Sequence, residues 1–528
     1  MDTTFDYLVI GAGSAGCALA ARLSMQPRTR VGLIEAGGPD KHPAIKVPAA
    51  FPMLIGTEYD WDYRTTPQPG LADRVIRCPR GRVLGGCSSI NAQVWTRGHR
   101  EDFDGWAAAG NPGWSYKEVE PYFQRSERRT GSNKEHTYGS DGPLHIQEIR
   151  SQSPATAAFL SACAERGFHA LPEANVADTT GYASLPATQR GGRRWSAADA
   201  YLRGLHHPNL TVLTNLRAER VTFDGVRATG VQVADQHGQS SALTARAEVI
   251  LSAGAVNSPQ LLMLSGIGDP EHLREHGIDC RITLPGVGNG LQDHLYVPLI
   301  VHCPQPVTLA AAGTLAARLT YLLRRRGPLT SNVGEAACFL PGDDTRTAPD
   351  LELAFLPVAF LDHGLDPISE HAITIAVDLI QPSSLGTVRL RSARATDPPR
   401  IDPRYLFDPG DIQTLVRGMN VAQSLLDTTA LAPYVGAPWF DDLDLGDAAS
   451  IESHIRHTAS TVYHLAGTCR MGIDADAVVD PTLRVHGADG LRVVDASIMP
   501  RITRGHIQAP VVMIAERAAD LITGRSIS

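Results

Sequence analysis

The sequence lacks the features that mark secreted, metal-binding or nucleic-acid-binding proteins. Its eight cysteines lie singly along 528 residues, with no CxxC pair, which argues against a disulfide scaffold or a zinc knuckle. The net charge is −8 and no basic stripe is present, so we expect no nucleic-acid partner. Scattered cysteines favour a reducing compartment, and we expect a cytoplasmic protein.

Long hydrophobic runs are also missing. The chain enters a predicted strand almost at once, which leaves no charged and apolar regions for a signal peptide. The longest charge-free stretch, residues 295–317, contains Pro298, Pro304 and Pro306 and makes a poor membrane span. We therefore expect no transmembrane helix.

One segment leaves a peripheral membrane contact open. Residues 314–327, TLAARLTYLLRRRG, place four leucines near one face of a predicted helix that ends in three arginines. Such a helix either lies on a membrane surface or packs on its own domain with a solvated basic end. A position at the inner face of the membrane is the alternative to a wholly cytoplasmic one.

The N-terminal stretch DYLVIGAGSAGCALAARLS predicts a buried strand, a glycine-rich turn and a helix. In this GxGxxG turn, Gly11 permits the tight turn, Gly13 lets backbone approach a pyrophosphate, and Gly16 lets the helix pack on the strand. Glu35 ends a second strand nineteen residues after Gly16, where an acid accepts hydrogen bonds from an adenosine ribose. The pattern predicts one bound dinucleotide.

The GxGxxG turn alone does not separate NAD from FAD. No second GxGxxG follows, because GVGNG at residues 286–290 has the wrong spacing. The electrons of the bound dinucleotide must therefore pass to something other than a second nucleotide.

Three further stretches have unusual composition. Residues 79–98 form a loop with four glycines, residues 254–268 read GAVNSPQLLMLSGIG, and LRVVDASIMP contains Asp495 at a predicted sheet edge. Together with PGVGNGLQDH, YHLAGTCRMG and GHIQAPVVMIAE, they resemble the glucose–methanol–choline (GMC) family of FAD-dependent oxidoreductases. The resemblance is strongest to its bacterial alcohol and choline dehydrogenase branch and runs from Phe5 to about Ile522.

The resemblance implies an α/β fold, α+β overall, with two domains. A Rossmann-like FAD-binding domain would comprise residues 1–155, 205–300 and 455–528. A substrate-binding domain would comprise residues 156–204 and 301–454 and carry a large antiparallel sheet covered by helices.

The resemblance also implies bound FAD, with the loop at residues 85–92 along the isoalloxazine. Some members attach FAD through a histidine of this loop, but the matching position is Ile90, which cannot form that bond, so we expect non-covalent FAD. The residues expected to contact it are Gly11, Gly13, Ser14, Ala15, Gly16, Glu35, Ala36, Arg82, Gly85, Gly86, Ser88, Asn91, Ala92, Val94, Val221, Ala253, Asp495, Ala496, His506 and Gln508.

Two histidines are the candidate catalytic residues. In the family pattern His464 matches the histidine of YHLAGTCRMG, and His506, before a helix expected to open at Pro510, matches its partner. A neutral imidazole can take the hydroxyl proton of an alcohol because its pKa lies near ambient pH. The resemblance implies oxidation of a primary alcohol, aliphatic or aromatic, with hydride transfer to flavin N5. Tyr463 and Glu335 are further candidates for the substrate pocket.

Other readings stay open. The fold class also includes non-redox lyases of the hydroxynitrile lyase type, and membrane-associated choline dehydrogenase-like enzymes that reduce quinone. The electron acceptor is oxygen or quinone, and neither the particular alcohol nor the oligomeric state follows from the sequence. Residues 272–276, HLREH, fit a zinc-peptidase pattern without an obvious third ligand, so no metal is expected.

Overall fold

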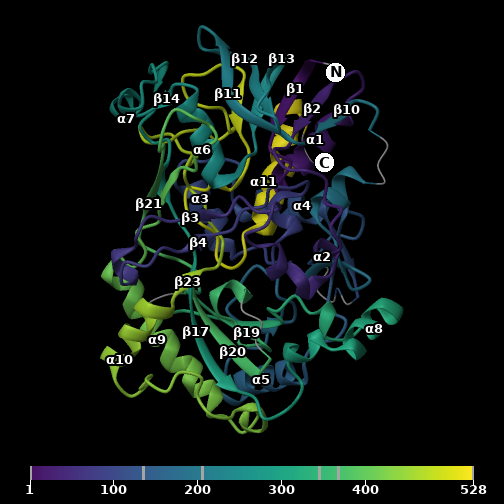
Figure 1. Cartoon of the computed structure of the whole chain (residues 1–528), viewed down its shortest axis with the longest axis vertical. Coiled ribbons are helices and arrows are strands. Elements are labelled where there is room, and N and C mark those ends of the chain that lie inside the picture. Colours follow the sequence, from purple (N-terminus) through teal and green to yellow (C-terminus); the bar gives the residue numbers. More distant parts are fainter. Residues whose placement is uncertain are drawn as a thin grey trace.

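The computed structural model describes residues 3–131, 133, 137–203, 207–342, 347–365 and 369–525. One large sheet with its helices lies at the end of the molecule that holds both chain termini, and a second lies at the opposite end (Figure 1). The domain boundary expected between residues 204 and 205, like the two chain ends, falls outside the described residues.

The sheet near the termini has seven strands. In spatial order they are β10 (Leu210–Leu213), β2 (Val31–Ile34), β1 (Thr4–Ile10), β13 (Ser240–Leu251), β12 (Arg227–Asp235) and β11 (Leu216–Asp224), with β24 (Leu491–Val493) beside β13. The first four and β24 pair in parallel, whereas β12 and β11 extend the sheet antiparallel. The parallel part is the expected Rossmann-like unit.

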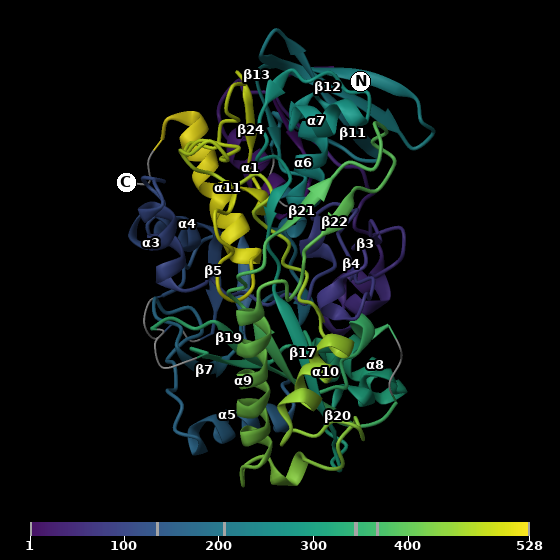
Figure 2. The same cartoon turned by 90° about the vertical axis from the view of Figure 1, so that its left-hand side faces the viewer.

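The N- and C-terminal segments lie side by side on this sheet. α1 (Ser14–Ser24) packs against α11 (Gln508–Thr523), and both are buried along most of their length (Figure 2). α11 begins at Gln508, two residues before the expected start, and Pro510 lies in its first turn, where a missing N–H leaves no hydrogen bond unmade. The last helix therefore covers the first.

The second sheet has six antiparallel strands, as expected for the substrate-binding part. They are, in spatial order, β23 (Ser460–Thr461), β17 (Leu295–His302), β20 (Ala372–Leu379), β19 (Leu351–Leu356), β18 (Ala336–Leu340) and β7 (Gly181–Ser184). Its helices are α5 (Pro154–Glu165), α9 (Pro409–Leu426) and α10 (Ala448–Thr458). These helices pack on one face, so the other face is free to form a cavity wall.

Strand alternation decides which side chains reach that cavity wall. In β19, Leu351, Leu353 and Phe355 join the core beneath the helices, and in β20 the residues from Ile373 to Leu379 at every second position do the same. The residues between them, including Glu352 and Asp378, must face the opposite side. Glu352 and Asp378 are register partners, so two carboxyl groups lie next to each other on that face.

Smaller elements connect the two sheets. The remaining helices are α2 (Pro43–Lys46), α3 (Arg100–Ala108), α4 (Tyr116–Ser126), α6 (Gly254–Leu264), α7 (Pro270–Glu275) and α8 (Leu315–Arg324). The short strands are β3 (Tyr63–Arg64), β4 (Arg77–Cys78), β5 (Glu127–Thr130), β6 (Leu144–Gln147), β8 (Ala187–Arg190), β9 (Arg193–Arg194), β14 (Ile267–Gly268), β15 (Ile282–Thr283), β16 (Asn289–Leu291), β21 (Gly386–Arg389) and β22 (Arg400–Asp402).

Short helical turns complete the framework. They are η1 (Pro48–Leu54), η2 (Pro69–Leu71), η3 (Gly86–Ser89), η4 (Ala198–Leu202), η5 (Leu309–Gly313), η6 (Pro328–Thr330), η7 (Asp362–Gly364), η8 (Ala432–Tyr434) and η9 (Ala496–Ile498). All eight cysteines are free thiols. Within the described ranges, none of the helices combines the length and the apolar character that a membrane span requires.

Candidate active site

A cavity of about 310 Å³ runs from the glycine turn after β1 to the inner face of the six-stranded sheet. It collects most of the residues that the sequence nominates. Those in its wall are Gly11, Gly13, Ser14, Ala15, Glu35, Ala36, Gly86, Asn91, Ala92, Val94, Ala253, Tyr463, His464, Asp495, Ala496, His506 and Gln508. One cavity therefore joins the predicted nucleotide site to both predicted catalytic histidines.

The nucleotide end is built by Glu35 and the glycine turn. Glu35 accepts backbone N–H bonds from Ala12 at 2.9 Å and from Gly37 at 2.8 Å, and burial raises its pKa to about 7. Gly16 is required by packing, because a Cβ there would lie 1.8 Å from the carbonyl oxygen of Gly11. These contacts hold the carboxylate in the cavity wall beside the turn.

Several unpartnered polar groups in this wall fit a dinucleotide. Gly13 caps α1 without a side-chain bond, so the first N–H groups of the helix are free for phosphate. Ser14 Oγ donates to Gln508 Oε1 at 2.8 Å, whereas Gln508 Nε2 and Ser252 Oγ are buried without a hydrogen-bond partner in the part of the chain that the structure describes. Such orphaned groups in a cavity wall call for a polar ligand.

Contrary to expectation, Val221 does not line the cavity. Its backbone N–H donates to Ser265 Oγ at 2.8 Å, and the side chain is buried in the core of the first sheet. The cavity is instead lined by Leu216, Arg217 and Ala218, at the start of the same strand. Val221 therefore lies farther along β11 than the residues that reach the cavity.

Glu335 is likewise absent from the cavity wall. Its carboxylate accepts hydrogen bonds from Ser153 N at 2.8 Å, Thr156 Oγ1 at 2.5 Å and Ser331 Oγ at 2.6 Å. These partners include the N-cap residue of α5, so Glu335 stabilises the start of that helix. Its neighbours Val333 and Gly334 line the cavity in its place.

Four other nominated cofactor residues, Gly16, Arg82, Gly85 and Ser88, lie behind the wall rather than in it. Ser88 Oγ donates to the Gly85 carbonyl at 2.6 Å and accepts from Ala197 N at 2.9 Å, which fixes the loop shape. The Arg82 guanidinium lies 5.1 Å from the Trp61 ring centroid, and its charge partly offsets the rise that burial causes in the pKa of Glu35. These residues support the site from outside.

Asp495 lines the cavity, but protein groups use both of its oxygens. Gly254 N and Ser258 Oγ donate to one, at 2.8 and 2.5 Å. Ser497 N and Oγ donate to the other, at 2.8 and 2.6 Å. Asp495 therefore ties the start of α6 to η9 at the carboxyl end of β24.

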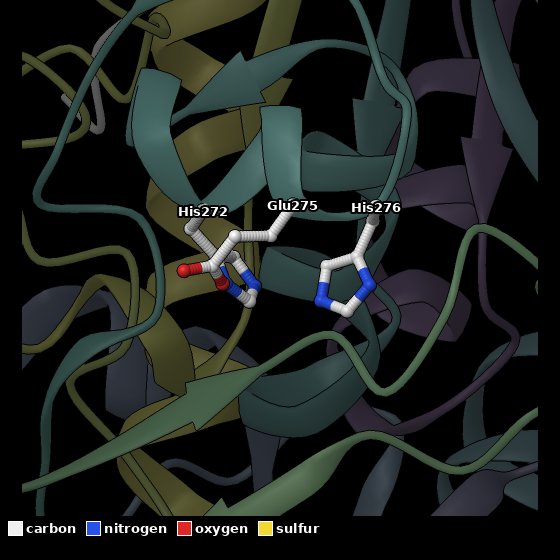
Figure 3. A group of neighbouring side chains, drawn as sticks. All are labelled: His272, Glu275 and His276. Atoms are coloured by element: carbon white, nitrogen blue, oxygen red, sulfur yellow. The ribbon is translucent and has the colours of Figure 1, made fainter.

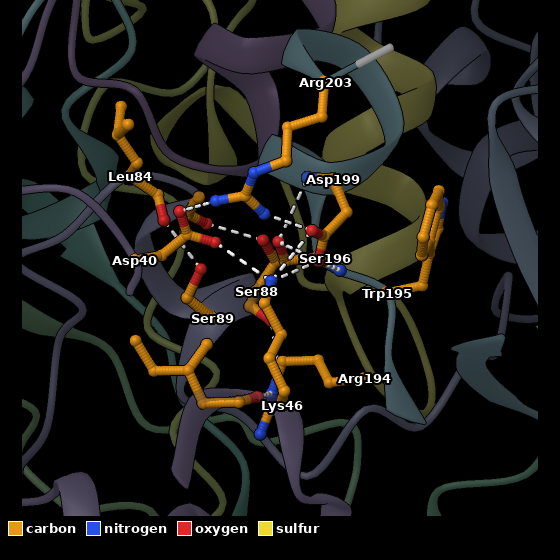
Figure 4. Close-up of polar contacts among 12 residues, drawn as sticks. Asp40, Lys46, Leu84, Ser88, Ser89, Arg194, Trp195, Ser196, Asp199 and Arg203 are labelled. Carbon is orange, nitrogen blue, oxygen red and sulfur yellow. Dashed lines mark hydrogen bonds and ion pairs between the residues drawn. The ribbon is translucent and has the colours of Figure 1, made fainter. Parts of the chain in front are cut away.

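A network of charged groups lies beneath the loop at residues 85–92 (Figure 4). Lys46 Nζ lies 2.6 Å from an Asp199 oxygen and 3.1 Å from an Asp40 oxygen, and Arg203 pairs with both carboxylates. Two cations and two carboxylates compensate one another, so the network holds α2 and η4 together without a net charge.

Arg194 clamps the same loop. Its guanidinium donates to the carbonyls of Ile45 at 2.7 Å and Ser88 at 3.1 Å, and to Asn91 Oδ1 at 2.7 Å. Burial lowers the pKa of Arg194 to about 9. The contact with Asn91 connects this buried cation to a residue of the cavity wall, and sequence patterns gave no sign of it.

His506 reaches the cavity from the loop before α11. Its backbone N–H donates to Thr96 Oγ1 at 2.7 Å, and its Nε2 lies 3.1 Å from Glu352 Oε1. Gly505 has φ +76°, and a Cβ there would lie 2.9 Å from Thr96 Oγ1, so only glycine fits before His506.

His464 is half-buried beside His506, with ring centroids 5.0 Å apart and ring planes at 84°. Its backbone N–H donates to Asp293 Oδ1 at 2.7 Å. Tyr405 and Thr461 donate their hydroxyls to the other oxygen of Asp293, each at 2.5 Å. The buried Asp293 therefore fixes the segment that carries His464.

A third histidine completes the group. His294 Nδ1 lies 3.0 Å from His464 Nδ1, and burial lowers the pKa of His294 to about 3. Burial also lowers the pKa of His464 well below its usual range, and the nearby His506 and His294 lower it further. Both imidazoles are therefore neutral near pH 7.

Tyr463, nominated for the pocket, does line the cavity. Its φ of +69° is left-handed, a conformation that costs a non-glycine residue roughly 1–3 kcal/mol. Thr461 Oγ1 accepts its N–H at 2.7 Å, Arg80 donates to its carbonyl, and its hydroxyl lies 2.8 Å from His363 Nδ1. These bonds hold the strained residue that precedes His464.

The far end of the cavity is mainly apolar and holds one carboxyl group. Phe51, Tyr296 and Phe360 contribute aromatic surface. Asp378 lines the same wall, and its Oδ1 is buried with no hydrogen-bond partner among the described residues. Burial raises the pKa of Asp378 well above its usual range, and the adjacent Glu352 raises it further.

The HLREH segment does not line this cavity. Its His272, Glu275 and His276 side chains lie near one another (Figure 3). Ligand atoms of His272, Glu275 and His276 lie within 4.8 Å of one another. However, the Leu390 N–H donates to His272 Nε2 at 3.0 Å, so the proton of a neutral His272 is on Nδ1, which faces Glu275 at 3.5 Å. Neither nitrogen of His272 then offers a lone pair to a metal.

A glycine turn at a helix N-terminus, joined by one cavity to a cluster of histidines, defines a dinucleotide-dependent oxidoreductase. Comparison with known proteins makes the class specific. Models of GMC oxidoreductase match residues 5–296 and 382–515. The chain therefore belongs to the GMC oxidoreductase family of FAD-dependent enzymes, as the sequence motifs predict.

Individual relatives match over almost the full length. The chain is 47% identical to an uncharacterized GMC-type oxidoreductase of Mycobacterium tuberculosis, over 99% of this chain and 100% of that one. It is 39% identical to the alcohol dehydrogenase [acceptor] of Pseudomonas putida, over 98% and 95%. The crystal structure of pyridoxine 4-oxidase from Mesorbium loti superposes with a TM-score of 0.90 at 34% identity, covering 99% and 100%.

Proposed function

We propose that the protein oxidises a primary alcohol to the aldehyde, with His464 taking the hydroxyl proton. The observation that carries this proposal is the Nδ1-to-Nδ1 contact between His464 and His294. If His464 Nδ1–H donates to His294, His464 Nε2 has a free lone pair, and no described residue hydrogen-bonds to that atom. A buried neutral imidazole with a free nitrogen is suited to act as a general base.

The other histidine has a separate task. His506 lies against Glu352, so its ring is held by a carboxylate while it faces His464. In this position it can hydrogen-bond the substrate oxygen as the proton leaves. Bound FAD would supply the hydride acceptor for this oxidation, and Gly13, Ser14 and Glu35 of the cavity wall would hold it. We expect FAD to be held non-covalently, because Ile90 stands where some family members carry the linking histidine, and its side chain has no nucleophilic atom.

The shape of the cavity supports an alcohol with an aromatic or extended apolar body. Phe51, Tyr296 and Phe360 would contact that body, and the unpartnered Asp378 Oδ1 would bind a second polar group on it. The relatives named for an alcohol and for pyridoxine as substrates favour the same class.

The decisive experiment is anaerobic addition of a panel of primary alcohols to the holoenzyme. Bleaching of the flavin absorbance supports alcohol oxidation, and flavin that stays oxidised with every alcohol contradicts it and favours the lyase reading. The same panel in air, with peroxide detection and with a soluble quinone, distinguishes oxygen from quinone as the acceptor.

Asp378→Asn and Asp378→Leu test whether Asp378 binds a second polar group of the substrate. Asp378→Leu should raise KM for an alcohol that carries a second polar group, such as a pyridine-methanol, by about tenfold, the effect of one buried hydrogen bond, and Asp378→Asn should raise it less because its amide can still form that bond. Benzyl alcohol should be affected less, and Asp474→Asn, at an exposed site, should change neither. Equal effects on both alcohols would contradict this role.

A further inference from the structure

α8 presents four leucines to solvent on one face. Leu315, Leu319, Leu322 and Leu323 are 72%, 48%, 63% and 80% exposed. Their spacing of four, seven and eight residues from the first places them along one side of the helix. We call this set the leucine face of α8.

The leucine face is fixed rather than frayed. The opposite side of α8 is anchored by Ala317 and Tyr321, which are buried, and the Tyr321 hydroxyl donates to the Lys46 carbonyl at 3.3 Å. Thr314 caps the helix by accepting the Ala317 N–H at 3.2 Å. Packing of this side therefore turns the leucines outward.

Single exposed leucines are common on protein surfaces, whereas groups of neighbouring exposed leucines are not. Twelve large hydrophobic side chains are exposed in the described parts of the chain, and four of them lie on this ten-residue helix. If each of these side chains were exposed independently of the others, they would be spread over the surface. The grouping indicates a surface that a partner covers.

Charge around the leucine face points to the kind of partner. From Leu295 to Gly334 the chain has no Asp or Glu but four arginines, although the whole protein carries a net charge of −8. Arg318, Arg324 and Arg326 are exposed on or just after α8. The charge of Arg193, on β9, also reaches Tyr321 and opposes the rise that burial causes in the pKa of its hydroxyl. A cationic rim around an apolar face suits an anionic, apolar partner.

α8 lies at the margin of the molecule, beside α2 and away from both chain termini (Figure 1). It packs on η5 and η6, and η6 packs on η1. Phe51 of η1 lines the active-site cavity. The leucine face is therefore two elements away from the substrate end of the cavity.

We propose that α8 docks the protein on the surface of an anionic phospholipid bilayer. The leucines enter the boundary between headgroups and acyl chains, and the arginines bind lipid phosphates. The alternative occupant, a second copy of this chain, is less suited, because a two-fold contact through this face brings two arginine clusters together. The proposal does not depend on which reaction the site performs.

The test is flotation of the FAD-loaded protein with phosphatidylcholine vesicles, with and without phosphatidylglycerol. Binding should require the anionic lipid and weaken as salt rises, because exposed charges are screened. Leu322→Ser/Leu323→Ser should reduce the bound fraction by at least about tenfold, and Arg324→Gln/Arg326→Gln should reduce the dependence on phosphatidylglycerol. The matched control Leu385→Ser, at a leucine 50% exposed in a loop outside α8, should bind like wild type.

FAD content and melting temperature of each variant show whether it is folded. Wild-type protein that stays with neither kind of vesicle overturns the proposal. Concentration-dependent self-association that the Leu322→Ser/Leu323→Ser variant abolishes, without vesicle binding by the wild type, also overturns it and assigns the face to a second copy.

Discussion

His464 is the residue on which the proposed chemistry depends most directly. His464→Ala should slow flavin reduction by about 10²- to 10⁴-fold, the usual contribution of a general base, with FAD content unchanged. His506→Asn should be milder because the amide can still hydrogen-bond the substrate oxygen, and His506→Ala should fall between the two. His237→Ala, on an exposed turn, is the control. Near wild-type reduction by His464→Ala, or activity loss that follows FAD loss, would contradict the assignment.

The pH dependence of the same step should follow mainly from the burial of His464. An imidazole with an ordinary pKa would make the rate rise with pH near neutrality, but burial lowers the pKa of His464 well below its usual range. The rate of flavin reduction should therefore be flat from about pH 6 to pH 8 and fall only at lower pH, where His464 takes up a proton.

His294→Asn, whose side-chain oxygen can still accept from His464 Nδ1–H, should keep the wild-type rate and profile. His294→Leu should slow the step about tenfold or more, because it removes the acceptor that selects the active tautomer. Stopped-flow reduction across pH measures both. A purely structural role would instead reduce FAD content and melting temperature equally in the two variants.

Stability should also depend on these buried imidazoles. The unfolded chain takes up a proton on each histidine near pH 6.5, whereas His294 in the native state does so only near pH 3. Between these values the unfolded state binds more protons, so the free energy of unfolding falls as the pH drops below about 6.5. The melting temperature of His294→Leu should fall less steeply with acid than that of wild type, and a parallel fall would contradict this.

At the scale of elements, local patterns predicted the first two strands, the first helix and the glycine turn. β1, α1 and β2 follow from one apolar run, one GxGxxG and one further apolar run. The pairing of distant strands was not predictable in the same way. Glu352 and Asp378 meet only through the β19–β20 register, so no local pattern marks them as neighbours.

The same reason explains which site residues were missed or misplaced. His294 lies in the quoted segment PGVGNGLQDH, which marked the family without revealing that its last residue contacts His464. Glu335 looked like a pocket acid, but its partners come from α5 and from Ser331, a folded arrangement that the sequence does not show. Val221 lies in β11, but only the start of that strand lines the cavity, and the sequence does not show where along the strand the cavity ends.

The loop at residues 85–92 yields a prediction at this scale. Ile90 offers no atom for a flavin bond, so acid or heat denaturation should release all of the yellow cofactor into the supernatant. Flavin that stays with precipitated protein would contradict non-covalent binding.

Glu35→Ala should lower FAD retention after dialysis, because a hydrogen bond to a charged group is worth about 1.5–3 kcal/mol. Glu271→Ala, at an exposed position of α7, should have no such effect.

For the whole molecule, the cavity that we assign to the cofactor lies between the two large sheets. Its wall includes Gly11 and Glu35 beside the first sheet, and Ala376 and Asp378 from the inner face of the second. A ligand that fills this space contacts both units only when they are folded and joined. Binding of FAD should therefore stabilise the protein as a unit rather than one sheet alone.

Removal of FAD should lower the melting temperature, and added FAD should restore it in a concentration-dependent way. At a free FAD concentration one thousand times Kd, FAD should raise the free energy of unfolding by about 4 kcal/mol. Adenosine diphosphate reaches only the glycine turn and Glu35, so it should restore less than FAD does. Scans at one fixed heating rate measure this, since unfolding of a large flavoprotein is often irreversible. Equal melting temperatures with and without FAD would show that the cofactor does not join the two sheets, and equal effects of the two nucleotides would confine binding to the glycine turn.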